Sequence, residues 1–160
     1  MPTRVSAIDR RLDASVGHAP PGSIVLSSHS LTSAFARYGA KLTNPQWAVS
    51  ALSKNNELVI SCWSHYLGSH DGALRYKDKL SRWDGNKAGT NLIRDHLNQA
   101  LNENMPVRLV IARTKQTDVV DSGGGAQSVE KTFGVREDLV GRVVTFDGDT
   151  FVVDFVRGGA

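Results

Sequence analysis

The stretch from Arg75 to Asn91 mixes cationic and aromatic side chains. Cations bind phosphate and aromatic rings stack on bases, so this mixture is typical of a surface that contacts nucleic acid. The candidate contact residues in the stretch are Arg75, Tyr76, Lys77, Lys79, Arg82, Trp83, Asn86 and Lys87. Trp63 and Tyr66 are further candidates for stacking on a base. The alternative is that Tyr76 and Trp83 are core residues beside solubilising lysines, because tryptophans are usually mostly buried.

Histidines form the other grouping that can do chemistry. His65 and His70, with Asp71 directly after the second, are candidates for a metal-dependent hydrolase. Their spacing matches no zinc motif, and the sequence has no His-Glu-x-x-His. We therefore expect hydrogen-bonding or surface histidines and no bound metal.

Signatures of other catalytic classes are missing from the sequence. The segment from Gly85 to Gly89 lacks the full phosphate-loop pattern, and no Gly-x-Ser-x-Gly motif occurs. A nuclease centre of clustered carboxylates would need a nearby lysine, but none follows Asp147, Asp149 or Asp154. The sequence thus predicts a non-catalytic protein that needs no cofactor.

Length and composition are those of one globular domain. The chain has 160 residues, of which 40% are hydrophobic and 22% charged, which is enough for a self-sufficient core. Its net charge of +3 permits nucleic-acid binding without requiring it. Cys62 is the single cysteine, which excludes an intramolecular disulfide and a multi-cysteine zinc site. No signal-like or membrane-spanning apolar segment is present, so we expect a cytoplasmic protein without membrane contact.

Two segments lack the periodicity of helices and strands. Residues 1–21 predict an irregular arm, whose three arginines can reach phosphate. Residues 22–160 form the single domain, and within it residues 121–128, DSGGGAQS, predict a flexible loop. The arginines of the arm are Arg4, Arg10 and Arg11.

Hydrophobic spacing predicts the elements of the first half. Residues 23–27 suit a buried strand, and Ser28 or Ser30 can cap a short helix that ends at Gly39. Period-two alternation from residue 47 to 52 and from 58 to 63 predicts a hairpin, with Asn55-Asn56 as its two-residue turn. With that turn, one face carries Trp47, Val49, Ala51, Ile60 and Cys62, and the other carries Val59, Ser61 and Trp63.

The second half alternates turn signals with strands around one longer helix. Asp71-Gly72 predicts a hairpin turn leading into a strand at 73–77, and residues 83–89 predict a loop. Thr90 or Asn91 can then cap a helix that runs to about residue 104, whose first amides can donate hydrogen bonds to a phosphate oxygen. Strands follow at 107–114 and 129–135, and the last hairpin spans 142–156 with Asp147-Gly148 as its turn. One face of that hairpin carries Val144, Phe146, Phe151, Val153 and Phe155.

These elements add up to about seven strands, one central helix and one short early helix. Because hairpins dominate, we expect an α+β domain with a mainly antiparallel curved sheet or pseudobarrel. The segment from Arg82 to Gly89 before a central helix, followed by a strand at Val107 to Arg113 and a terminal hairpin, resembles the PUA-like pseudobarrel group. The resemblance is architectural. It implies a module that reads nucleic acid, as do modified-base readers of bacterial restriction systems, some of which flip a base into an aromatic-lined pocket.

Three functions follow as hypotheses. The first is a non-catalytic nucleic-acid-binding module, with DNA favoured, that can read a modified or flipped base. The second is a protein-interaction or accessory factor of a bacterial or phage mobile element or defence system, in which the 121–128 loop and an exposed sheet edge meet a partner. The third is the metal-dependent hydrolase of His65, His70 and Asp71.

Overall fold

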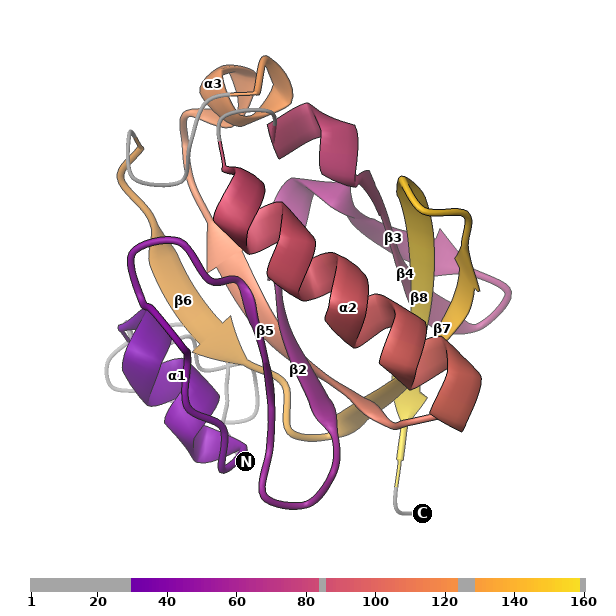
Figure 1. Cartoon of the computed structure of the whole chain (residues 1–160). Helices are drawn as coiled ribbons and strands as arrows, with labels where there is room; N and C mark the ends of the chain where they lie inside the picture. Colours follow the sequence, from indigo (N-terminus) through magenta and orange to yellow (C-terminus); the bar gives the residue numbers. More distant parts are fainter. Residues whose placement is uncertain (1–29, 84–85, 124–128, 159–160) are drawn as a thin grey trace, which may run out of the picture.

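The computed structural model describes residues 30–83, 86–123 and 129–158. Within these ranges lie three α helices and one open sheet of eight mostly antiparallel strands, which confirms the expected α+β class (Figure 1). The helices are α1 Leu31–Arg37, α2 Lys87–Glu103 and α3 Thr117–Asp121. The strands are β1 Ser50–Leu52, β2 Leu58–Trp63, β3 Leu67–His70, β4 Ala73–Lys79, β5 Val107–Arg113, β6 Thr132–Val135, β7 Leu139–Phe146 and β8 Thr150–Arg157. The expected arm at 1–21 and strand at 23–27 lie outside the described residues, as do positions 124–128 of the expected loop.

The strand order is β1-β2-β5-β7-β8-β4-β3, and β6 pairs with β5 beside this path. Along one edge, β5 pairs with β2 in parallel. Along its other edge, β5 pairs with β7 at its first residue, Val107, and with β6 over residues 110–113. Figure 1 shows α2 lying across one face of the sheet and α1 beside β6. The sheet therefore stays open, with different strands at its two ends, rather than closing into a barrel.

The sheet separates two hydrophobic clusters. On the α2 side, Ile93 and Leu97 pack into the larger cluster, which includes Ile60 from β2 and Leu109 from β5. On the opposite side, α1 contributes Phe35 to a cluster completed by alternate residues of the same two strands. Because successive residues of a strand point to opposite faces, β2 and β5 can be buried on both. Their near-continuous apolar sequences reflect this double burial.

The short first helix forms as its sequence predicts. Ser30 is the N-cap, and its hydroxyl accepts a hydrogen bond from the Ser33 amide at 3.0 Å. Residue Gly39 follows the helix with φ of 73°, a left-handed conformation that glycine adopts without steric cost. The helix buries Ala34 and Phe35.

The first hairpin has a different register from the one predicted. Ser50 pairs with Ile60 and Ala51 with Val59, so Ala51 shares a face with Val59 rather than with Ile60 and Cys62. The cause is the turn: the Ser53 amide donates to the Glu57 carbonyl at 2.9 Å, which encloses three residues instead of two. Asn56 supplies the left-handed residue such a loop needs, with φ of 61°. Strand β1 begins only at Ser50, so the prediction that Trp47 and Val49 belong to it was wrong.

The second hairpin confirms the Asp71-Gly72 turn. His70 pairs with Ala73 across it, and the two turn residues have φ of 48° and 82°. Both positive values fit a two-residue turn of type I′. Its first strand, β3, was not predicted: Leu67–His70 carries one partly buried residue followed by three exposed ones, so it lacks the alternation of a half-buried strand.

In the last hairpin, the predicted inward residues of β8 are confirmed, whereas the prediction for β7 was wrong at Val144. Phe151, Val153 and Phe155 are buried toward α2. The turn residues are Gly148 and Asp149, since Asp147 donates its amide to the Thr150 carbonyl at 3.2 Å. A bulge between Val143 and Thr145 then places Val143 opposite Val153, so the inward residue is Val143 rather than Val144. Val144 is 45% exposed.

Candidate nucleic-acid interface

Strand β4 divides the predicted contact residues between its two faces. Tyr76 and Asp78 are buried, whereas Lys77 and Lys79 are exposed and Arg75 is partly exposed. This alternation is the period of a strand with one buried face. The Tyr76 side chain belongs to the core, as in the alternative reading of the sequence. The three cations share the outward face.

One outward row holds an ion pair between β4 and β8, with Arg142 of β7 beside it. Asp154 on β8 lies between Arg75 on β4 and Arg142 on β7 in the sheet register. Arg75 binds the Asp154 carboxylate with two hydrogen bonds, at 2.7 and 2.8 Å. These bonds lower the pKa of Asp154, so the carboxylate stays charged and neutralises Arg75. Arg142 is exposed on the other flank of Asp154, and its guanidinium donates to the Gly141 carbonyl.

The neighbouring rows carry lysines that form no direct ion pair, although the charge of Lys79 acts on the Asp147 carboxyl. Lys77 lies opposite Val152 and Lys79 opposite Thr150 in the register of β4 and β8. Within the described chain, neither lysine forms an ion pair. No described helix packs against these outward side chains, since α2 lies on the other face. We call this surface the basic face and define it as the outward side chains Arg75, Lys77 and Lys79 of β4 and Arg142 of β7.

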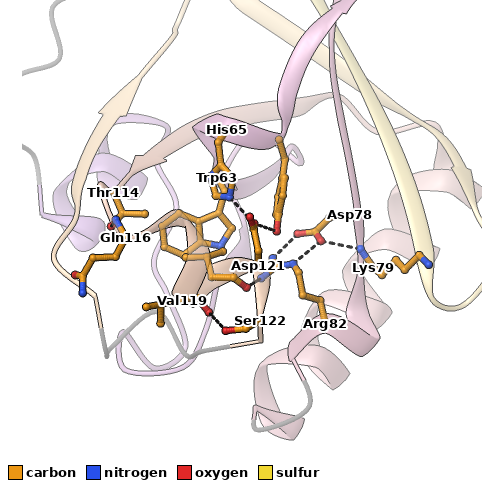
Figure 2. A network of polar contacts seen from close by, with 12 residues as sticks. Trp63, His65, Asp78, Lys79, Arg82, Thr114, Gln116, Val119, Asp121 and Ser122 are labelled. Carbon is orange, nitrogen blue, oxygen red and sulfur yellow. Dashed lines mark hydrogen bonds and ion pairs between the residues drawn. The ribbon is translucent and has the colours of Figure 1, made fainter.

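Arg82 takes no part in the basic face. Its guanidinium forms two hydrogen bonds with the Asp78 carboxylate, at 2.8 and 2.6 Å, and a third with the Val120 carbonyl (Figure 2). Asp78 also accepts hydrogen bonds from the Tyr76 hydroxyl and the Lys79 amide, both at 2.8 Å. Burial disfavours the charge of Arg82, but the bonds to Asp78 outweigh it and raise the pKa of the guanidinium. Arg82 is therefore a structural cation, held in a buried ion pair.

The candidate stacking residues lie around Arg82. Its guanidinium carbon is 5.0 Å from the centre of the Tyr66 ring and 5.3 Å from that of Trp83, within the range of cation–π contact. Both rings are partly buried against the core, and Trp63 is only 8% exposed. The rings of Tyr66 and Trp83 thus already have a cationic partner.

His65 and Tyr66 share one acceptor instead of lining a metal site. Asp121 Oδ1 accepts from the Tyr66 hydroxyl at 2.5 Å and contacts His65 Nε2 at 2.9 Å, which ties the turn η2 (Ser64–Tyr66) to the end of α3 (Figure 2). Burial, and then the bond to Asp121, raise the pKa of Tyr66 to about 12, so its hydroxyl keeps its proton at neutral pH. His70 contacts Asp71 instead, at 3.4 Å. Across the described ranges, no three histidine, cysteine, aspartate or glutamate side chains gather as metal ligands.

The N-cap of α2 lies four residues before Thr90, the earlier of the two expected caps. The N-cap is Asn86, whose side-chain oxygen accepts from the Gly89 amide at 3.0 Å while its Nδ2 donates to the Trp47 carbonyl at 3.0 Å. Gly89 permits this contact, because a Cβ there would lie 2.6 Å from the Trp47 carbonyl oxygen. The amides after Gly89 were expected to bind phosphate, but the Thr90 amide already donates to the Asn86 carbonyl at 2.9 Å. Asn86 has a structural role. Lys87 is exposed in the first turn of the helix.

One pair of chemically suggestive residues was missed from the sequence. Ser50 Oγ lies 2.8 Å from His96 Nδ1, the distance expected of a serine and its base. Ser50 is fully buried, however, so a substrate cannot reach its hydroxyl. Burial lowers the pKa of His96 and favours its neutral form. The pair joins β1 to α2. Its two residues are 46 positions apart, and no sequence motif predicts a contact between them.

Comparison with known proteins yields no relative. No family model matches the sequence, and no curated protein or solved structure matches it either. No helix of the described ranges has the length and apolar character needed to cross a membrane. The chemistry of the basic face is therefore the main guide to function.

Proposed function

We propose that the protein is a cytoplasmic, non-catalytic nucleic-acid-binding module, with DNA as the favoured ligand. The observation that carries the proposal is the outward placement of Lys77 and Lys79 on β4, which form no ion pair in the described chain, beside exposed Arg142. Ammonium and guanidinium groups on an uncovered sheet are complementary to a phosphate backbone.

The chemistry of the remaining candidates supports binding rather than catalysis. Arg82 is held by Asp78, and Ser50 is buried beside His96. The Asp121 carboxylate, which could orient His65 as a base, is shared with Tyr66, and no described nucleophile bonds to His65. The basic face, in contrast, requires no further group to attract phosphate.

Fluorescence anisotropy with a labelled 20-base-pair DNA duplex tests the proposal. Neutralising the basic face with Lys77→Gln, Lys79→Gln and Arg142→Gln together should weaken binding uniformly across duplex sequences. The matched control removes three positive charges elsewhere, from exposed lysines outside β4, β7 and β8, with the same glutamine substitution. These lysines are Lys41, Lys54 and Lys115.

The comparison of the two variants separates local from overall charge. Equal weakening by both would show that net charge alone attracts DNA, and would overturn the assignment to the basic face. Absence of binding by the wild-type protein at low salt would overturn the function itself.

A protein partner is the second candidate function, and one observation favours it. Val156 lies on the outward side of β8 and is 51% exposed, and Val144 at the bulge of β7 is 45% exposed. Exposed apolar side chains near cations also fit a protein interface. Substituting both valines by threonine should abolish such an interaction but leave DNA binding unchanged, which distinguishes the two functions.

A further inference from the structure

We infer that the nucleic acid taken by the basic face is a duplex, held through its phosphates without base stacking. This inference rests on the proposed function and specifies its ligand. It follows from three properties of the described residues: the burial of their aromatic rings, the spacing of the outward cations, and the charge of the β7–β8 turn.

The first property is that the basic face offers no ring on which a base can stack. Proteins that bind single strands usually combine cations with exposed aromatic side chains, which stack on successive bases. Every tryptophan, tyrosine and phenylalanine in the described ranges is buried or partly buried. The aromatic residues of β4 and β8 point inward to the core: Tyr76, Phe151 and Phe155 are each 0% exposed. The outward neighbours on β8 are Val152, Asp154 and Val156.

Two part-exposed rings outside the basic face, those of Tyr66 and Trp83, already have partners. Tyr66 and Trp83 have the guanidinium of Arg82 over their faces, and the Tyr66 hydroxyl is bonded to Asp121. A base stacking on the ring faces that Arg82 covers would have to displace a cation that Asp78 holds with two hydrogen bonds. A flipped base in this cluster is therefore disfavoured.

The second property is the two-dimensional spread of the cations. Arg75, Lys77 and Lys79 alternate along β4, so neighbouring cations of that row are roughly 6.7 Å apart along the strand. Arg142 lies two strands away from Arg75, across β8, which is roughly 9.6 Å at the usual strand spacing. A duplex presents two phosphate backbones across grooves of about 6 and 12 Å, so both the lysines of the β4 row and Arg142 can meet phosphate. A single strand that follows the β4 row leaves Arg142 without a partner.

The third property is that the projecting turn of the last hairpin is acidic. Gly148 is flanked by Asp147 and Asp149. The amides of Asp149 and Thr150, and to a smaller extent the charge of Lys79, lower the pKa of the Asp147 carboxyl, while the Asp149 carboxylate accepts two hydrogen bonds from Ser81. Two carboxylates at the tip repel phosphate and oppose insertion of the hairpin into a groove. Contact through the flat face, with phosphate and without base edges, predicts binding that is independent of sequence.

The test compares a fluorescein-labelled 20-base-pair DNA duplex with each of its separate strands at 50 mM salt. We expect the duplex to bind at least roughly fivefold more tightly, because the single strands gain none of the stacking energy that normally offsets their lower charge density. Tryptophan fluorescence should stay unquenched at saturation. Equal or tighter binding of single strands, or quenching that Trp83→Phe removes, would overturn this inference and leave the proposed function standing. If neither form binds, the proposed function itself is wrong.

Discussion

Replacing Asp78 tests the assignment of Arg82 to the protein interior. The Asp78 side chain is 3% exposed and that of Arg82 is 12% exposed. In Asp78→Ala, Arg82 loses two hydrogen bonds and its counter-charge, and the Tyr76 hydroxyl loses its acceptor. Removing one partner of a buried ion pair generally costs about 3–5 kcal/mol. Because Arg82 keeps the Val120 carbonyl and some access to water, we expect the lower end, about 3 kcal/mol.

The loss is measured as the change in the free energy of unfolding, by urea denaturation followed with circular dichroism. For a domain of this size a loss of about 3 kcal/mol corresponds to a fall in Tm of roughly 6–12 °C. The matched control is Glu130→Ala, an exposed carboxylate whose removal should change stability by no more than about 0.5 kcal/mol.

A double-mutant cycle then isolates the pair. Removing both charges with Asp78→Ala and Arg82→Ala should cost less than the sum of the single losses, because the double variant leaves no uncompensated charge. The buried pair would be refuted if the losses of the two single variants added up to that of the double variant, or if Asp78→Ala lost less than about 1 kcal/mol. Arg82 would then again be a candidate for phosphate contact.

Three further predictions concern the basic face, the His96 contact and the start of α2. Asp154→Asn frees Arg75 for phosphate, so the slope of log binding constant against log salt should steepen by about 0.9; an unchanged slope would show that Arg75 does not reach the ligand. Since burial lowers the pKa of His96, the unfolded state takes up its proton first, and stability should fall as pH drops below about 6.5. Urea midpoints at pH 8 and pH 5 measure this fall, which should shrink in His96→Gln; an equal fall in both proteins would contradict it. Gly89→Ala should cost about 1–2 kcal/mol in urea denaturation instead of gaining from helix propensity, because the new Cβ would lie 2.6 Å from the Trp47 carbonyl oxygen; a stabilised variant would contradict the close contact.

Local signals in the sequence predicted those elements that local chemistry decides. Ser30 caps α1 with its own side chain, and Asp71-Gly72 supplies both positive φ values of its turn. The strand after Pro106 begins at Val107, as its alternation indicates. The outward placement of Lys77 and Lys79 follows from the same alternation, which is why the sequence could identify part of the basic face.

Features that depend on distant residues escaped prediction. The sequence suggests that Arg82 is a surface cation. In the structure it binds the buried Asp78 carboxylate and the Val120 carbonyl, which is 38 positions away. Asn86 caps α2 because Gly89 lets the Trp47 carbonyl approach, and a glycine within a helix reads as a loop signal. The hairpin before β2 shifted by one residue, since Asn56 made the turn three residues long. Each difference reflects a tertiary contact or turn geometry that overrides local propensity.

The salt dependence of duplex binding tests the central claim most directly. Lys77, Lys79 and Arg142 supply three cations, so log binding constant against log salt should have a slope near −2.7, at about 0.9 for each phosphate contact. Affinity should then fall roughly 40-fold between 50 and 200 mM salt, and Lys77→Gln with Lys79→Gln should reduce the slope by about 1.8. A slope near zero, or one that the double substitution leaves unchanged, would contradict phosphate binding by the basic face.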